Sequence, residues 1–216
     1  MSGTVQHLHP VVPAPDDPPV GAGADHPMRK VTRQVAFEPE GWDAARRAKV
    51  AGLFNDLAPE WHTRLSEERL EVVYDALDRG GLTGGPGTVC VEVGSGTGFA
   101  TPLLDDRFDQ VLAVDVAIEM LRRAPADAGH RILADAATLP VADGSVDAVV
   151  LVNALLFPRE IDRVLGPGGA VVWVSSLGDR TPIYLSATDV AAALPGSWTG
   201  VSSSAGWGTW SVHRRG

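Results

Sequence analysis

Short uninterrupted apolar runs recur along the chain from residue 88 onward. They predict buried strands at residues 88–93, 110–115, 131–134, 146–152 and 170–175. Because these runs are apolar throughout rather than alternating, we expect a parallel sheet covered on both faces. Stretches with helical periodicity lie between or after them, near residues 99–105, 117–123, 158–165 and 187–194. This alternation of strand and helix is typical of a doubly wound α/β fold.

The two ends of the chain depart from this rhythm. Residues 198–204 and 207–214 are separated only by Ala205-Gly206, which predicts an antiparallel hairpin. Upstream, apolar residues at a spacing of three to four predict one helix from Trp42 to Pro59 and a second over residues 67–79. We therefore expect an α/β fold with a doubly wound, mostly parallel seven-stranded sheet, a C-terminal antiparallel hairpin and an N-terminal helical segment.

Proline marks the first part of the chain. Seven of the sixteen prolines precede residue 40, and residues 10–27 offer almost nothing to bury. Such a segment cannot recover the entropy lost on ordering, so we expect residues 1–38 to form a disordered Pro-rich tail. Met28 is an alternative start of translation. Residues 39–216 are then a single domain, with N-terminal helices at 39–87 and a Rossmann-like core at 88–216.

Composition narrows the classes of partner and compartment. The net charge of −9 disfavours binding to nucleic acid. One cysteine, Cys90, allows no internal disulfide and gives no metal-ligand spacing, which fits a reducing cytoplasm. No signal peptide is evident, and the longest apolar run, residues 148–158, is too short to span a membrane. We expect a cytoplasmic protein without a metal, nucleic acid or membrane partner, and a homodimer remains open.

The strongest chemical signal is a glycine loop directly after the first buried strand. It reads Glu92-Val93-Gly94-Ser95-Gly96-Thr97-Gly98. Ligands of a parallel α/β sheet bind beyond the carboxyl ends of the strands, where glycines allow close approach of the backbone and supply N–H groups. The spacing fits neither the dinucleotide fingerprint G-x-G-x-x-G nor the P-loop G-x-x-x-x-G-K-[ST]. A glycine loop alone does not identify the ligand.

The order of motifs along residues 88–175 resembles that of class I S-adenosylmethionine-dependent methyltransferases. The glycine loop has the form acid-x-G-x-G-x-G, and Asp115 ends the next strand with a carboxylate. The loop at residues 134–140 and the R-V-L-G-P-G-G stretch at residues 163–169 follow in the family's order. Residues 53–62 are similar to the N-terminal segment of the quinone-biosynthesis-type small-molecule enzymes, with Trp61-His62 where Tyr-Asp is usual.

The resemblance implies a Rossmann-like fold that binds S-adenosylmethionine. It implies that Glu92 contacts the amino group of the cofactor and that Asp115 accepts from the ribose hydroxyls. Asp135 would accept from the adenine amino group, while the backbone N–H of Ala136 meets a ring nitrogen. The full set of expected cofactor-binding residues comprises Trp61, Glu92, Gly94, Ser95, Gly96, Gly98, Asp115, Val116, Met120, Asp135, Ala136 and Asn153.

The resemblance further implies transfer of a methyl group to a small-molecule acceptor by in-line displacement. Such a reaction depends mainly on positioning, so no catalytic residue follows from the sequence, and His62 is the candidate general base. Asp179, Arg180 and Tyr184 are candidates for the acceptor pocket. Two other hypotheses stay open: a protein that binds the cofactor without turnover, as a regulator or assembly partner, and a nicotinamide-dependent oxidoreductase, which the glycine spacing disfavours.

Overall fold

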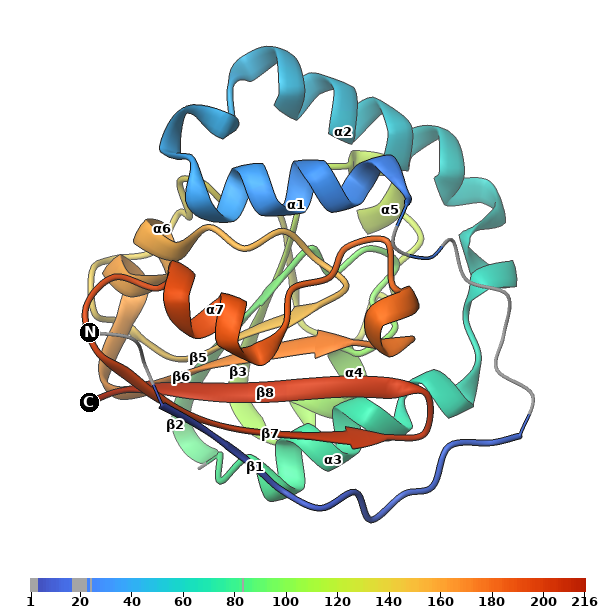
Figure 1. Cartoon of the computed structure of the whole chain (residues 1–216). Coiled ribbons are helices and arrows are strands. Elements are labelled where there is room, and N and C mark those ends of the chain that lie inside the picture. The colour runs from blue at the N-terminus through green and yellow to red at the C-terminus, as the bar shows by residue number, and fades with distance from the viewer. Residues whose placement is uncertain (1–3, 17–22, 24, 83) are drawn as a thin grey trace.

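An eight-stranded sheet runs through the centre of the molecule (Figure 1). The computed structural model describes residues 4–16, 23, 25–82 and 84–216. In chain order the strands are β1 (Thr4–His7), β2 (Gly85–Val93), β3 (Phe108–Asp115), β4 (His130–Leu133), β5 (Val146–Val152), β6 (Leu165–Ser175), β7 (Trp198–Ala205) and β8 (Gly208–Arg215). Across the sheet they lie in the order β1-β7-β8-β6-β5-β2-β3-β4.

The pairing of these strands confirms the predicted mostly parallel sheet. The strands β4, β3, β2, β5 and β6 pair in parallel, each with its neighbour in the sheet. β8 pairs antiparallel with both β6 and β7, so the C-terminal hairpin is also confirmed. Its two-residue connection contains Gly206 with a φ of 53°, a left-handed conformation that suits glycine.

Helices cover the sheet on both faces. Because side chains alternate along a strand, Val91 and Val93 of β2 enter one hydrophobic core while Cys90 enters another. The first core is closed by residues of α1 (Pro27–Phe37), α6 (Pro158–Val164) and α7 (Ala187–Ala193). The second is closed by α3 (Glu71–Arg79) and α4 (Thr101–Asp105). The double covering explains why the strand sequences are apolar throughout.

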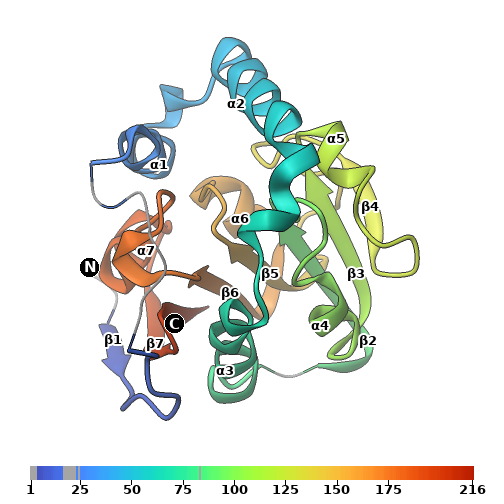
Figure 2. The same cartoon turned by 90° about the vertical axis from the view of Figure 1, so that its right-hand side faces the viewer.

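The remaining helices lie at one end of the sheet. α2 (Ala44–Leu57) contacts α5 (Ile118–Leu121), which follows β3. Figures 1 and 2 show α1 and α2 across the end of the sheet at which β3 ends. The described residues also form four short 3-10 helices: η1 (Pro39–Gly41), η2 (Ala58–Arg64), η3 (Glu67–Arg69) and η4 (Gly178–Arg180). The helix expected over residues 67–79 is therefore divided into η3 and α3.

The prediction of a disordered tail is wrong for two segments of residues 1–38. Thr4–His7 form β1, an eighth strand, and pair in parallel with β7, so they satisfy backbone groups that the sheet edge would otherwise leave unpaired. Pro27–Phe37 form α1, in which Met28 and Val35 are buried and the His26 ring accepts the backbone N–H of Met28. The average composition of the tail conceals these two short segments. Residues 1–3, 17–22 and 24 lie outside the described residues.

Candidate functional site

A cavity of about 460 Å³ lies at the carboxyl ends of the parallel strands. The loops that follow β2, β3, β4, β5 and β6 all contribute to its lining. Residues of α2 and η2 line it as well. Parallel strands bring their carboxyl ends to one edge of a sheet, so residues 94, 116, 135, 153 and 176 meet here although they are far apart in the chain.

Most of the cofactor-binding residues that the sequence predicts line this cavity. They are Trp61, Glu92, Gly94, Ser95, Gly96, Asp115, Val116, Met120, Asp135, Ala136 and Asn153. Gly98 is the exception. Its φ is 72°, and a Cβ atom there would lie 3.0 Å from Cδ of Pro125. Glycine is therefore required at this position by the backbone conformation of the loop and by close packing, and not by contact with the cavity.

The glycine loop is shaped by close approach and by left-handed backbone. Gly94 has a φ of 68°, and a Cβ on it would lie 2.7 Å from Cβ of Ala154. Gly96 has a φ of 57°, and a Cβ on it would lie 3.9 Å from Nε1 of Trp61. The N–H groups of Gly94 and Ser95 both donate to the carbonyl of Val114, at 2.8 and 3.1 Å. These two N–H groups therefore hold the loop against β3.

Glu92 is a buried carboxyl group at the end of β2. Its side chain accepts a hydrogen bond from Oγ1 of Thr101, 2.5 Å away. Burial raises the pKa of Glu92 to about 8, against the effect of the Thr101 hydroxyl and with a smaller contribution from the charge of Asp115. A cation placed beside this group would stabilise its ionised form. The position thus suits the amino group of the predicted cofactor.

Asp115 ends β3 with both carboxylate oxygens held by backbone. Oδ2 accepts the N–H of Gly96 at 2.8 Å, and Oδ1 accepts that of Ala117 at 2.7 Å. Burial raises the pKa of Asp115, and these N–H groups oppose the shift. Each carboxylate oxygen has a second lone pair, so a pair of ribose hydroxyls can still donate to it. The geometry fits the predicted role.

Asp135 differs from the expectation because other side chains already occupy it. Nε1 of Trp42 lies 3.0 and 3.2 Å from its two carboxylate oxygens, and Arg47 donates to Oδ2 at 3.3 Å. The backbone N–H of Ala137 donates to Oδ1 at 2.9 Å. Trp42 also packs edge-on against Phe157, with ring centroids 5.2 Å apart. Trp42 and Arg47 escaped the sequence analysis because the sequence shows only the start of a helix there.

Asn153 directly follows β5 and connects two loops of the cavity. Its φ of 52° is unusual for a residue other than glycine. The side-chain amide donates to Oγ of Ser176 and accepts the backbone N–H of Ser176, both at 2.9 Å. One amide hydrogen still has no partner among the described residues. The predicted contact of Asn153 with cofactor or acceptor is compatible with this arrangement.

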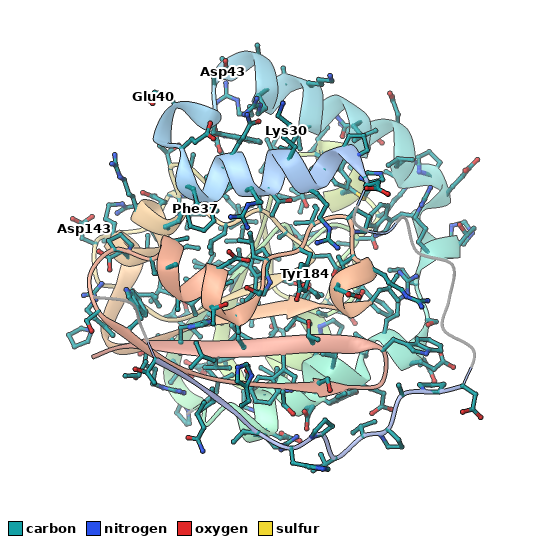
Figure 3. The ribbon with its side chains drawn as sticks, in the orientation of Figure 1. Lys30, Phe37, Glu40, Asp43, Asp143 and Tyr184 are labelled. Carbon is teal, nitrogen blue, oxygen red and sulfur yellow. The ribbon has the colours of Figure 1, made fainter. Side chains whose placement is uncertain are left out.

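Four polar residues named from the sequence do not line the cavity. His62 is exposed on η2, so its proximity to Trp61 in the chain does not bring its ring to the site. Asp179 and Tyr184 instead hold α1. The Arg29 side chain donates to the carbonyl of Asp179, and its guanidinium lies 4.7 Å from the ring centroid of Tyr184, which Figure 3 shows beneath α1. Arg180 lies in η4, away from the cavity lining.

Two arginines on the cavity wall were missed as well. Arg64 ends η2 and Arg69 ends η3. Burial lowers the pKa of Arg69, and the nearby positive charge of Arg64 lowers it further. In the sequence they are two of many arginines, and no motif distinguishes them.

The residues present fit the predicted cofactor. Oγ of Ser95, in the glycine loop, is buried and has no hydrogen-bond partner among the described residues. The space above Gly96 and the remaining lone pairs of Asp115 complete a site for a polar ligand. In the described part of the chain, no three His, Cys, Asp or Glu side chains gather as a metal site. No described helix is long and apolar enough to cross a membrane.

The curated relatives of this chain align with a little under half of its length. The biotin biosynthesis bifunctional protein BioHC of Cellvibrio japonicus is 37% identical over 108 residues, which cover 45% of this chain and 21% of that protein. The malonyl-[acyl-carrier protein] O-methyltransferase of Methylococcus capsulatus is 35% identical over 112 residues, which cover 45% of this chain and 40% of that protein. The chain thus covers well under two thirds of either relative's length.

Two solved structures show the same fold over a larger share of the chain. A SAM dependent methyltransferase from Aquifex aeolicus superposes with a TM-score of 0.57 at 20% identity, covering 72% of this chain and 96% of the other. The DhpI-SAH complex superposes with a TM-score of 0.61 at 19% identity, covering 77% and 95%.

Part of the sequence of the core matches a known protein family. Residues 91–173, which include the glycine loop, Asp115, Asp135 and Asn153, match the family described as methyltransferase domain. Together with the sheet order and the solved structures, this match over less than half of the chain shows a methyltransferase domain with the class I fold.

Proposed function

We propose that this protein transfers the methyl group of S-adenosylmethionine to a small-molecule acceptor by in-line displacement. The observation that carries the proposal is the cavity in which Glu92, Asp115 and the glycine loop lie together. The bound cofactor supplies an electrophilic methyl group on a sulfonium. The protein therefore has to orient two ligands and exclude water, which is how positioning lowers the barrier of such a transfer.

The residues divide this work between them. The Asp115 carboxylate would hold the ribose, and Glu92 would hold the amino group, becoming ionised as it does so. Trp61, which packs edge-on against Phe54 with centroids 5.7 Å apart, covers the cavity from η2. Its ring face suits a sulfonium through cation–π attraction. Val116 and Met120 offer an apolar surface for the adenine.

The curated relatives support a transfer reaction of this kind. One is named as an O-methyltransferase whose acceptor is malonyl-[acyl-carrier protein]. That acceptor belongs to the relative, which the chain covers only in part. What supports a small acceptor here is the size of the cavity, about 460 Å³, within the range of small-molecule sites.

Calorimetry with S-adenosylhomocysteine and S-adenosylmethionine tests the cofactor site. We expect the wild type to bind both and Asp115→Ala to bind neither measurably. Asp56→Ala, which removes an exposed carboxylate from α2, is the matched control and should bind as the wild type does. Unchanged binding by Asp115→Ala would refute the assignment. NAD, titrated in parallel, should give no heat.

Release of S-adenosylhomocysteine in the presence of an acceptor panel tests turnover. Tight binding without release on any acceptor would favour a protein that binds the cofactor without catalysis.

The proposed compartment is the cytoplasm, with which the single buried thiol of Cys90 is compatible. A homodimer, and the lack of a nucleic-acid partner, stay predictions that light scattering and a DNA-binding assay can check.

A further inference from the structure

The cavity wall carries two guanidinium groups that pair with no acid among the described residues. Arg64 and Arg69 both line it, and burial of Arg69 together with its proximity to Arg64 makes this a concentrated positive charge. Within the described part of the chain, neither guanidinium forms a hydrogen bond or an ion pair. The guanidinium of Arg64 lies 5.9 Å from the ring centroid of Trp61, within the distance of a cation–π contact. Arg69 is half-buried and Arg64 is exposed beside it, so a negatively charged ligand in the cavity would stabilise both guanidinium groups.

The cofactor alone does not balance these charges. The carboxyl groups that line the cavity are Glu92, Asp115 and Asp135, and Asp135 is already paired with Arg47 at 3.3 Å. The amino and carboxylate groups of S-adenosylmethionine cancel one another, while its sulfonium adds a positive charge. With Glu92 and Asp115 ionised, the loaded cavity keeps a surplus of positive charge. An acceptor with one negative charge removes it.

The lining also lacks a group suited to remove a proton from an acceptor. Among the described residues that line the cavity there is no His, Lys, Cys or Tyr side chain. The three carboxyl groups face the predicted cofactor positions or pair with Arg47. An alcohol or an ammonium acceptor has to lose a proton to react, whereas an oxyanion is already nucleophilic at neutral pH. The surplus positive charge of the cavity and its lack of a proton-accepting side chain therefore both favour an anionic acceptor.

We propose that the acceptor is an oxyanion, a carboxylate or a phosphoryl group, which Arg64 and Arg69 bind and which is methylated on oxygen. This inference rests on the proposed methyltransferase function. A carboxylate or phosphoryl group has more than one oxygen, so one can accept from a guanidinium while another faces the methyl group. A lone pair of the free oxygen forms the new O–CH3 bond as the C–S bond breaks. The electron pair of that bond stays on sulfur, the product is a methyl ester, and no proton moves.

Anion binding to the complex with S-adenosylhomocysteine gives a first test, independent of turnover. Inorganic phosphate and acetate are titrated by calorimetry into protein saturated with S-adenosylhomocysteine, in a buffer without other oxyanions. We expect saturable binding to the wild type and at least tenfold weaker binding to Arg64→Gln and Arg69→Gln. Arg159→Gln removes an exposed arginine of α6 outside the cavity and should bind as the wild type does.

The same variants separate the acceptor from the cofactor. We expect their affinity for S-adenosylhomocysteine to change less than threefold. If both variants lose S-adenosylhomocysteine binding tenfold and keep anion binding, the arginines serve the carboxylate of the cofactor, and the inference is wrong. Absence of anion binding to the wild type would also refute it. Failure of the wild type to bind S-adenosylhomocysteine at all would instead overturn the proposed function.

Transfer assays then distinguish the two sources of oxyanion. Carboxylates of increasing chain length and alkyl phosphonates are compared with the matching primary amides and alcohols, with esters detected by mass spectrometry. We expect turnover with one of the anionic sets and none with the neutral analogues. The variants should raise KM for that anion at least tenfold, with a smaller effect on kcat. Turnover of a neutral alcohol or amine at an equal rate in Arg69→Gln would contradict the proposal.

Discussion

Trp42 should compete with the adenine of the cofactor for Asp135, and Trp42→Phe therefore should strengthen cofactor binding. In the structure, the indole N–H donates to both oxygens of Asp135 at 3.0 and 3.2 Å. Oδ1 also accepts from Ala137, and Oδ2 also accepts from Arg47. A carboxylate has about four lone-pair sites, and the Trp42 N–H, which contacts both oxygens, together with Ala137 and Arg47 makes four contacts there, so an adenine amino group has to displace one of them. Trp42 is the donor that phenylalanine can replace with little change of shape.

The expected gain follows from the strength of that hydrogen bond. A hydrogen bond to a charged group contributes about 1.5–3 kcal/mol. Asp135 is partly exposed, with 14% of its side chain accessible, so the lower end of this range applies. Since about 1.4 kcal/mol is a factor of ten in affinity, Trp42→Phe should bind S-adenosylhomocysteine about tenfold more tightly. The T-shaped packing of residue 42 against Phe157 is preserved by a phenyl ring.

Calorimetry with a matched pair of ligands isolates this effect. S-inosylhomocysteine replaces the adenine amino group by a carbonyl oxygen and therefore lacks the amino donor predicted to bind Asp135. We expect Trp42→Phe to tighten binding of S-adenosylhomocysteine and to leave binding of S-inosylhomocysteine within twofold of the wild type. An equal gain for both ligands would mean that Trp42 acts by obstruction alone. Unchanged or weaker binding of S-adenosylhomocysteine would refute the competition.

Three further predictions concern two buried acids and one glycine of the cavity loop. Burial raises the pKa of Glu92 to about 8 from 4.5, so between these pH values the native state keeps a proton that the unfolded chain releases. The free energy of unfolding, measured by urea titration without ligand, should therefore fall from about pH 4.5 to pH 8 and level off above. The same titrations of Glu92→Gln should lack this slope. In the second core, Asp75 accepts a hydrogen bond from Nε1 of Trp210 at 2.6 Å. Asp75→Ala should lower the free energy of unfolding, measured by urea denaturation, by about 3 kcal/mol, because the variant leaves the buried indole N–H unpaired. Trp210→Phe should lower it by less. Gly94→Ala should lower the melting temperature and abolish S-adenosylhomocysteine binding, since its Cβ would lie 2.7 Å from Cβ of Ala154; a fully stable variant with native affinity would contradict this.

The strands and the floor of the cavity could be predicted because their signals are local. A strand buried on both faces needs an apolar run, and β5 has the same bounds in the sequence analysis and in the structure. The carboxylates at positions 92 and 115 lie at the carboxyl ends of such strands, so predicting their position required no knowledge of tertiary contacts. The topology then brought them together.

The tail and the cavity roof could not be predicted because their partners are distant in the chain. β1 depends on the edge of β7, nearly two hundred residues away, and no periodicity within four residues reveals that pairing. Trp42 contacts Asp135 across 93 positions. His62 is the opposite case, since a suitable side chain beside Trp61 turned out to be exposed to solvent. A short segment's own composition says little when its stability comes from elsewhere.

The part of the chain from which a cavity residue comes determines which of the two proposed ligands, cofactor or acceptor, that residue can bind. The floor consists of loops after the parallel strands and supplies carboxylates in fixed positions, held by backbone N–H groups, as Asp115 shows. The roof consists of residue 42, α2, η2 and η3 and supplies the two cations of the acceptor side, Arg64 and Arg69. Substitutions in the floor should therefore change cofactor affinity, whereas substitutions of these two arginines should change acceptor affinity. Trp42 reaches across from the roof to the floor carboxylate of Asp135, so Trp42→Phe should act on the cofactor side although the residue belongs to the roof.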